Sequence, residues 1–195
     1  MSISNNNSRR KFLKKSVIIP PLFIVPRHVL GGKGFTAPSD KLNIAGVGVR
    51  EWGRGSNNIH QSRNENIVAL CDVDFNQSKP TFDKYPKAKV YKDYRVMLDK
   101  QKDIDAVIVS TPDHNHAVIT MKAIKMGKHV YCEKPLTHTV YEAREITKAA
   151  KKYNVQTQMG NQGRSSDEIR KLKEWIDDDA IGPVRELLAW TDRPI

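Results

Sequence analysis

The sequence has few cysteines, few aromatic residues and no long apolar run. Two cysteines among 195 residues exclude a small scaffold held together by disulfides. Aromatic residues make up 7% of the chain and do not alternate with basic residues, so a nucleic-acid partner is not expected. The apolar stretch at residues 16–25 would span about 15 Å as a helix, half a bilayer core, and Pro20 and Pro21 interrupt it. A stable membrane anchor is therefore not expected.

The sequence does have an excess of positive charge, and much of it lies at the beginning of the chain. There are 33 Lys and Arg residues against 22 Asp and Glu, which gives a net charge of +11. Residues 1–40 account for +6 of this charge, so the remainder is only mildly basic. With 38% hydrophobic residues, that remainder is typical of one globular domain and at most part of a second.

The first forty residues have the layout of an export signal. A polar Asn/Ser segment precedes residues 8–15 (Ser-Arg-Arg-Lys-Phe-Leu-Lys-Lys), and the apolar stretch follows. Arg9 and Arg10 resemble the pair that the twin-arginine translocase reads. We therefore expect residues 1–40 to be a twin-arginine signal and linker, the translocase to be a partner, and the protein to be periplasmic or otherwise exported. The cleavage site stays open, because residues 31–37 match a small-x-small site only loosely.

From residue 41 onwards, short β-rich runs alternate with helical patterns. The runs are almost continuously apolar, as in strands that are covered on both faces of a parallel sheet. We expect strands at residues 42–48, 67–71, 104–109, 129–132 and 155–159, and a short edge strand at 89–91. Helical patterns occupy residues 77–84, 94–100, 116–126 and 140–153. The alternation predicts an α/β fold of the Rossmann type, a doubly wound parallel sheet with right-handed crossovers.

Cys71 and Cys132 both fall in expected strands. In the usual strand order of this fold, two other strands separate them, so they lie roughly 14 Å apart. That separation exceeds the reach of a disulfide. Both are expected to be buried free thiols.

A glycine-rich turn follows the first expected strand. Gly46 and Gly48 have the spacing that lets a backbone turn tightly and approach a pyrophosphate lying on the amides of the next helix. Asp72 ends the second strand, where a carboxylate accepts hydrogen bonds from an adenosine ribose and repels a 2′-phosphate. Together these signals favour NAD over NADP as the cofactor.

Glu51 stands where the usual fingerprint has its third glycine. A carboxylate about 5 Å from the phosphates, at an effective dielectric constant of about 20, would repel them by nearly 3 kcal/mol, about a hundredfold in affinity. On this reasoning, replacing Glu51 by glycine tightens cofactor binding. The neighbouring Arg50, or a helix that begins only at Gly53, would reduce the penalty.

Two further turns follow the fourth and fifth strands: residues 110–116 (Ser-Thr-Pro-Asp-His-Asn-His) and residues 133–135 (Glu-Lys-Pro). Parallel sheets bind ligands at the carboxyl ends of their strands, beside the reversal of strand order, so both turns should face one crevice. Position alone leaves other interpretations open. Asp113 and the histidines fit a solvated, capped helix N-terminus, and Lys134 fits a surface lysine. A metal site is not expected, because His114 and His116 point away from each other on a helix.

Taken together, the motifs resemble the glucose-fructose oxidoreductase, inositol dehydrogenase and rhizopine-catabolism (Gfo/Idh/MocA) oxidoreductases. The resemblance runs from residue 42 to the end and includes the turns above, residues 159–163 (Met-Gly-Asn-Gln-Gly) and residues 189–195. It implies an NAD-dependent oxidoreductase that passes a hydride between a carbinol carbon of a sugar or polyol and the nicotinamide. Lys134 would be the catalytic residue that polarises or deprotonates the substrate hydroxyl. The implied cofactor-binding residues are Gly46, Gly48, Gly53, Asp72, Ser110, Thr111, Pro112, His116, Glu133, Lys134 and Gln162.

The resemblance also sets the expected domain division. Residues 41–163 would form the Rossmann domain, and residues 164–195 would begin a second, α+β substrate domain with a strand within 181–190. The amphipathic segment 169–176 is expected to pack on the Rossmann core. Family members continue with an antiparallel sheet that completes the site and joins subunits into a homo-oligomer, so the chain is expected to be an N-terminal fragment.

Two features leave alternatives open. Arg50 and Glu51 replace two glycines of the family's phosphate loop, and most of the substrate domain would be missing. A non-catalytic dinucleotide-binding fragment is therefore one alternative. An NAD-dependent glycosidase of the same family, in which the cofactor returns to its starting state, is the other.

Overall fold

The computed structural model describes residues 36–190, and the chain divides into two units between Lys41 and Leu42. The first unit contributes a short 3-10 turn, Pro38–Asp40. The expected twin-arginine motif and the apolar stretch after it lie outside the described residues. In the part of the chain that is described, no helix is long and apolar enough to cross a membrane.

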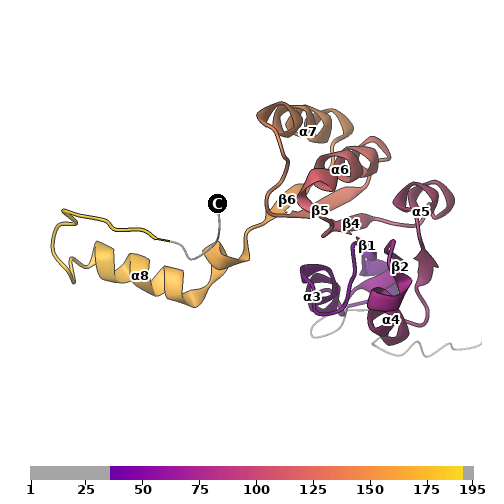
Figure 1. Cartoon of the computed structure of the whole chain (residues 1–195), viewed down its shortest axis with the longest axis horizontal. Coiled ribbons are helices and arrows are strands. Elements are labelled where there is room, and N and C mark those ends of the chain that lie inside the picture. The colour runs from indigo at the N-terminus through magenta and orange to yellow at the C-terminus, as the bar shows by residue number, and fades with distance from the viewer. Residues whose placement is uncertain (1–35, 191–195) are drawn as a thin grey trace, which may run out of the picture. The chain divides into compact units, whose positions relative to one another are not determined.

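A six-stranded sheet forms the centre of the second unit (Figure 1). Its strands are β1 (Asn43–Val47), β2 (Asn66–Cys71), β3 (Lys89–Tyr91), β4 (Ala106–Val109), β5 (His129–Glu133) and β6 (Thr157–Gly160). They run in the order β3-β2-β1-β4-β5-β6, and every neighbouring pair is parallel. This is the doubly wound Rossmann order that the sequence predicts. The order in which successive strands are added reverses between β1 and β4: β2 and β3 lie on one side of β1, and β4, β5 and β6 lie on the other.

Helices cover both faces of the sheet (Figure 1). They are α3 (Arg54–Gln61), α4 (Phe75–Lys84), α5 (Tyr94–Lys100), α6 (His116–Lys125) and α7 (Val140–Tyr153). Particular residues determine two of the helix ends. Thr139 and Glu142 form a capping box at the start of α7, and Gly127 adopts a φ of 73° after α6. The sequence patterns located four of these helices. A helix was expected after the glycine turn, but no pattern gave the range of α3, because its buried residues are mostly small or polar: Gly55, Ser56, Asn58 and Ile59.

The core has two parts, one on each face of the sheet. On the side of α5, α6 and α7, residues such as Val107, Val109, Ile124 and Val130 are buried together. On the side of α3 and α4, the buried cluster consists of Ile44, Val49, Ile59, Leu70, Ala88 and Ile108. Almost every apolar strand residue thus has a helix to pack on, which explains the continuous apolar runs.

Both cysteines are buried free thiols, as expected. Cys71 ends β2, and Cys132 lies on β5, with β1 and β4 between those strands. Burial, followed by the charges of Asp72 and Asp93, raises the pKa of Cys71 to about 12. Its thiol therefore stays protonated at neutral pH and is not a nucleophile.

The segment after β6 differs from the expectation. A 3-10 turn, Gln162–Ser165, leads to α8 (Asp167–Asp177), in which no residue is buried. Its apolar side chains, expected to pack on the Rossmann core, are about half exposed: Ile169, Leu172, Trp175 and Ile176. Residues 181–190 form no strand, and Leu187 is 80% exposed. A strand needs a neighbour to accept its backbone hydrogen bonds, and the described part of the chain offers this segment none.

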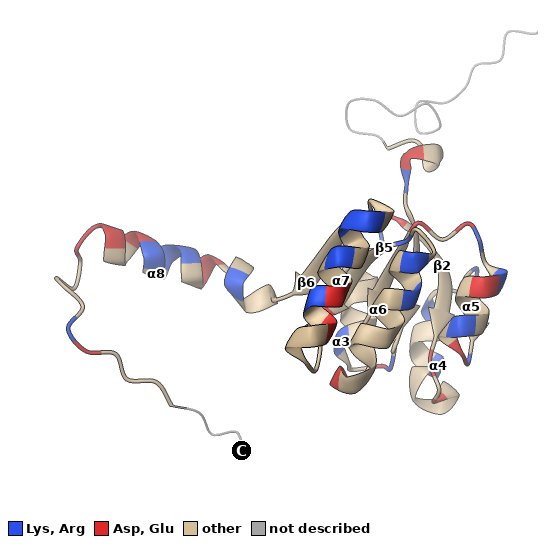
Figure 2. Cartoon of the chain, turned by 90° about the horizontal axis from the view of Figure 1, so that it is seen from above, with Lys and Arg blue, Asp and Glu red and all other residues tan. Residues whose placement is uncertain are grey.

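Charged residues of both signs are mixed on the outer helices (Figure 2). On α7, Lys148 pairs with Glu145, and on α8, Arg170 pairs with Asp167. Such exposed pairs favour solubility more than stability.

Candidate functional site

A cleft of about 550 Å³ opens at the carboxyl ends of β1, β2 and β4. This is the place beside the strand-order reversal where doubly wound sheets bind ligands. Six of the predicted cofactor-binding residues line it: Gly48, Gly53, Asp72, Ser110, Thr111 and Pro112. The other five, Gly46, His116, Glu133, Lys134 and Gln162, are not among its lining residues.

Gly48 forms the floor of the cleft. Its φ is 80°, in the left-handed region that favours glycine, and its amide donates to the Cys71 carbonyl at 2.9 Å. A Cβ at this position would lie 2.7 Å from the carbonyl oxygen of Ser110. The turns after β1 and β4 therefore approach so closely that no side chain fits between them.

Two other glycines let α3 pack against β1. A Cβ on Gly46 would lie 2.7 Å from side-chain atoms of Ile59 and Val49, so this glycine serves packing beneath the cleft. A Cβ on Gly55 would overlap the carbonyl oxygen of Gly48. Gly55 thus takes the third-glycine role that the fingerprint assigns to position 51. Sequence reasoning missed it because the loop here is longer than the fingerprint allows.

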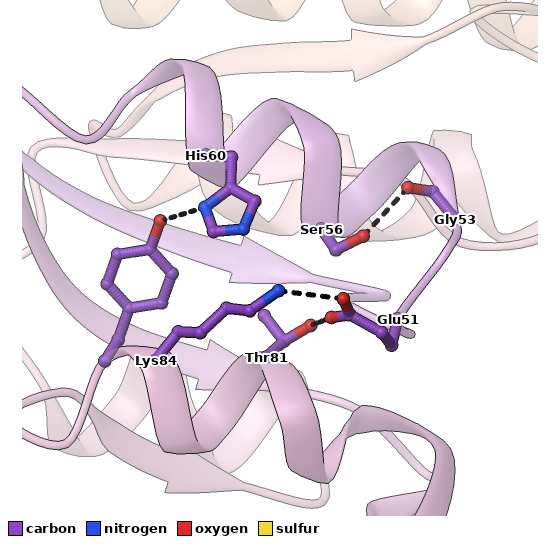
Figure 3. A network of polar contacts seen from close by, with 7 residues as sticks. Glu51, Gly53, Ser56, His60, Thr81 and Lys84 are labelled. Atoms are coloured by element: carbon purple, nitrogen blue, oxygen red, sulfur yellow. Dashed lines mark hydrogen bonds and ion pairs between the residues drawn. The ribbon is translucent and has the colours of Figure 1, made fainter.

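The expectation that Glu51 faces the phosphates is wrong. Its carboxylate turns toward α4, where it accepts hydrogen bonds from Thr81 Oγ1 and Lys84 Nζ, each at 2.8 Å (Figure 3). These hydrogen bonds, that of Lys84 first, lower the pKa of Glu51. The physical reason is the late start of α3: Gly53 is its N-cap, as the alternative interpretation held, and the longer loop carries residue 51 away from the cleft.

Asp72 lies on the cleft wall at the end of β2. The residue is 9% exposed, and one carboxylate oxygen accepts a hydrogen bond from the amide of Asp74 at 3.0 Å. Its own amide donates to the carbonyl of Tyr91 on β3 at 3.1 Å. Backbone contacts on both sides therefore fix the carboxylate at the position where the sequence places a ribose-binding group.

The turn after β4 forms the opposite wall. The amide of Ser110 donates to the carbonyl of Val47 at 2.8 Å, which extends the pairing of β4 with β1. Thr111 also lines the cleft, and its buried hydroxyl has no hydrogen-bond partner among the described residues. A buried hydroxyl without a partner is costly unless a ligand or water satisfies it. This wall is therefore suited to a polar ligand.

His116 lies beneath this wall and is 1% exposed. Its Nδ1 lies 2.6 Å from the carbonyl oxygen of Pro135, and its Nε2 lies 2.8 Å from that of Thr111. Two carbonyl acceptors require both ring nitrogens to carry a proton. Burial alone lowers the pKa of His116, but the neighbouring Cys132 and the hydrogen bonds to the two carbonyls outweigh it and raise the pKa to about 9. His116 is therefore not part of a solvated helix N-terminus, as one interpretation held. It connects the turn that contains Thr111 to the turn that contains Pro135.

Glu133 is the centre of a polar network beside the cleft. The residue is 4% exposed, and its Oε1 accepts hydrogen bonds from Asn58 at 2.7 Å and from Gln162. The amide of Gln162 also donates to the Tyr131 hydroxyl at 2.9 Å. Burial, and then the charge of Glu133, raise the pKa of Tyr131, whose hydroxyl stays protonated. Asn58 and Tyr131 were missed because no sequence spacing links them to the motifs.

Lys134 follows Glu133 and has an exposed side chain. The network holds the residue before it, and His116 holds the carbonyl of the residue after it. The turn is thus fastened at both ends while the lysine between them projects to solvent. This arrangement can present an ammonium group to a ligand bound outside the sheet.

No group of three or more His, Cys, Asp or Glu side chains within residues 36–190 could hold a metal ion. His114 is exposed, whereas His116 two residues later is buried. The two imidazoles therefore have different surroundings, as expected for residues two positions apart at a helix N-terminus.

These residues fit a dinucleotide. The floor at Gly48 is open because a Cβ is absent, the Asp72 carboxylate stands on one wall, and the Thr111 hydroxyl without a partner stands on the other. The strand order and this cleft define a dinucleotide-binding Rossmann domain. A family model described as "Oxidoreductase family, NAD-binding Rossmann fold" matches residues 42–161. The chain belongs to this family, the Gfo/Idh/MocA oxidoreductases, and contains its NAD-binding domain.

Several relatives of known name are similar to the chain. Inositol 2-dehydrogenase of Salmonella typhimurium is 30% identical over 148 residues, which cover 73% of this chain and 43% of that protein. D-glucoside 3-dehydrogenase of Escherichia coli is 30% identical over 151 residues, which cover 75% and 42%. The chain therefore spans about two fifths of the length of these relatives.

Solved structures show the same domain. An NAD-binding protein from Listeria innocua superposes with a TM-score of 0.65 at 27% identity, covering 73% of this chain and 42% of that chain. Myo-inositol 2-dehydrogenase from Lactobacillus plantarum gives a TM-score of 0.60 at 27% identity, with the same coverage. The matched part is in each case the smaller part of the other protein.

Proposed function

We propose that this domain binds NAD, in preference to NADP, as the cofactor-binding part of a sugar or polyol dehydrogenase. The observation that carries the proposal is the Asp72 carboxylate, fixed by backbone contacts on the wall of a cleft whose floor is the Gly48 turn. A carboxylate there pairs with ribose hydroxyls and repels an additional phosphate. The names of the relatives, an inositol and a glucoside dehydrogenase, support the substrate class.

The chain's residues divide the work of such a reaction. The backbone around Gly48 and Gly53 would receive the diphosphate, Asp72 the adenosine ribose, and the turn at residues 110–112 the remainder of the dinucleotide. Bound NAD supplies the hydride acceptor. Lys134 would hydrogen-bond to the substrate hydroxyl and, as the neutral amine, accept its proton. The contacts at Glu133 and Pro135 would hold that lysine in place.

Calorimetric titration of the full chain with NAD tests the binding step. We expect one site in the wild type and a large loss of affinity in Gly48→Ala, because the new Cβ would meet the Ser110 carbonyl. Gly127→Ala is a matched control: Gly127 also has a positive φ, 73°, but a Cβ there meets nothing within 4 Å. If the wild type gives no heat with NAD, or if both variants lose binding equally, the cleft is not the NAD site.

Turnover is proposed only together with a substrate domain, because the relatives are longer. We would join residues 36–163 to the carboxyl-terminal part of a related inositol dehydrogenase and follow NADH with inositol. Steady formation of NADH supports the dehydrogenase. Cleavage of a glycoside without net NADH would favour the glycosidase alternative, and NAD binding without any turnover would favour a non-catalytic domain.

We also propose export by the twin-arginine route, which rests on the sequence of residues 8–15 alone. Replacing Arg9 and Arg10 by lysine keeps the charge and removes the pair that the translocase reads. We expect the double variant to remain in the cytoplasm when expressed in a Gram-negative host, whereas a Lys14→Arg, Lys15→Arg control is still exported. Periplasmic recovery of the double variant at the wild-type level would contradict this proposal.

A further inference from the structure

The loop between β1 and α3 is anchored to α4 on one side. The backbone amide of Glu51 donates to the carbonyl of Gln77 at 3.1 Å, and the Glu51 carboxylate accepts from Thr81 and Lys84 at 2.8 Å each. All three partners belong to α4, as the close view shows for the two side chains (Figure 3). The Glu51 side chain is only 14% exposed. A partly buried, charge-assisted contact of this kind fixes the loop more firmly than an exposed ion pair does.

The same loop presents basic residues on its other side. Arg50 and Arg54 line the cleft, and Glu51 between them does not. The amide of Gly53 donates to the Arg50 carbonyl at 3.2 Å, and Trp52 adopts a φ of 58°, so the chain reverses between these residues. With Glu51 directed to α4, the reversal leaves Arg50 on the cleft side. Neither arginine forms an ion pair with another residue in the described ranges.

We propose that Arg50 binds the diphosphate of the dinucleotide and that Glu51 is a positioning residue, which directs Arg50 into the cleft by anchoring the loop to α4. The inference rests on the proposed NAD binding and adds to it a source of positive charge. A guanidinium can bind phosphate oxygens with two parallel hydrogen bonds. The carboxylate of Glu51 then favours phosphate binding from a distance, although its own charge is negative.

The role of Arg50 is tested by titrating the full chain with ADP-ribose and with adenosine, which lacks the phosphates. We expect Arg50→Gln to weaken ADP-ribose binding about tenfold and to reduce its dependence on salt, with adenosine binding unchanged. Arg50→Lys should recover part of the loss, because it restores the charge without the planar fork. Arg63→Gln, which removes the same charge from a residue outside the cleft lining, should have little effect.

The role of Glu51 is tested by whether its substitution raises or lowers the affinity for ADP-ribose. If Glu51 repelled the phosphates, Glu51→Gln would tighten ADP-ribose binding; as a positioning residue it should weaken binding several-fold. Lys84→Met should have a similar effect, and the double variant should be no worse than either single one, because both break one contact. Lys79→Met is the control: this lysine of α4 also pairs with a carboxylate, that of Asp83, but does not contact the loop.

The outcomes separate this inference from the proposed function. If the wild type binds neither NAD nor ADP-ribose, the proposed function fails and the inference fails with it. If the wild type binds and Arg50→Gln binds ADP-ribose equally well, the roles of Arg50 and of Glu51 as its positioning residue are overturned, while the proposed function stands. A loss of NADP binding alone in Arg50→Gln would assign the arginine to a 2′-phosphate and overturn the diphosphate assignment. Unchanged adenosine binding shows that each variant keeps a folded cleft.

Discussion

The side-chain amide of Asn58 lies 2.7 Å from the carboxylate of Glu133, although 75 positions separate the two residues in the chain. The same nitrogen lies 3.2 Å from the hydroxyl of Ser110. One residue of α3 therefore connects the ends of β4 and β5, the strands whose following turns carry the predicted catalytic and cofactor-binding residues. The contact fixes the relative position of these turns.

Replacing Asn58 should destabilise the domain. In Asn58→Leu the buried Glu133 carboxylate loses a donor, so we expect the free energy of unfolding to fall by about 2 kcal/mol. Urea denaturation measures it. Asn57→Leu, an exposed neighbour on the same helix, serves as the control and should change stability by less than about 0.5 kcal/mol. Equal effects of the two substitutions would show that the contact is not important for stability.

The carboxylate of Asp72 should set the preference for NAD over NADP. Asp72→Asn keeps the shape of the side chain and removes its charge, so the ratio of the two affinities should fall by about tenfold or more. The ratio is the right quantity to measure, because any loosening of the β2 turn affects both ligands. Equal affinities of the wild type for NAD and NADP would refute the assignment.

Gly55 should tolerate no side chain. A Cβ there overlaps the Gly48 carbonyl, so Gly55→Ala must push α3 away from β1. We expect a loss of about 3 kcal/mol in the free energy of unfolding, together with weaker NAD binding. Gly163→Ala, where a Cβ meets nothing within 4 Å, is the comparison and should leave both unchanged. Wild-type stability of Gly55→Ala would mean that the loop is not packed as described.

His116 should make the stability of the domain depend on pH. Its pKa is raised from 6.5 to about 9 in the folded state, so its contribution is complete below about pH 6.5 and is lost as the pH rises through about 9. The decline should be on the order of 1 to 3 kcal/mol across that interval. Urea denaturation at several pH values should show it in the wild type and in His114→Gln, but not in His116→Gln. The same slope in His116→Gln would assign the effect to another group.

Lys134 should act in turnover rather than in cofactor binding. In the fusion with a substrate domain, Lys134→Ala should reduce kcat by roughly 10² to 10⁴, as expected for a residue that assists proton transfer. The affinity for NAD, measured by calorimetry, should stay nearly the same, since Lys134 does not line the cleft. A collapse of NAD binding with little change in kcat would make Lys134 a cofactor contact.

The sheet could be predicted from the sequence because its evidence is local. The inner strands β2, β1, β4 and β5 are covered on both faces, so nearly every position in them must be apolar, and this pattern can be recognised without knowledge of the neighbouring strands. The range of helix α3 could not be predicted in the same way. It packs so closely on β1 that glycine, serine and asparagine fill its buried face, and a periodic apolar stripe never forms.

The site was harder to predict, because the spacing of residues in a motif does not determine where their side chains point. Glu51 occupies a fingerprint position, yet Thr81 and Lys84, about thirty residues later, decide where it points. His116 belongs to a motif at a cleft but is buried, because carbonyls from two turns converge on it. Each outcome depends on contacts between distant segments, which one sequence does not reveal.

Gln162, the second residue after the sheet ends, donates hydrogen bonds to both Tyr131 and Glu133. The exit of the chain from the Rossmann unit is thereby fastened to the strand that leads into Lys134. A domain attached beyond this point would be connected to that strand through these hydrogen bonds. A displacement of Gln162 would therefore act directly on the Glu133 carboxylate.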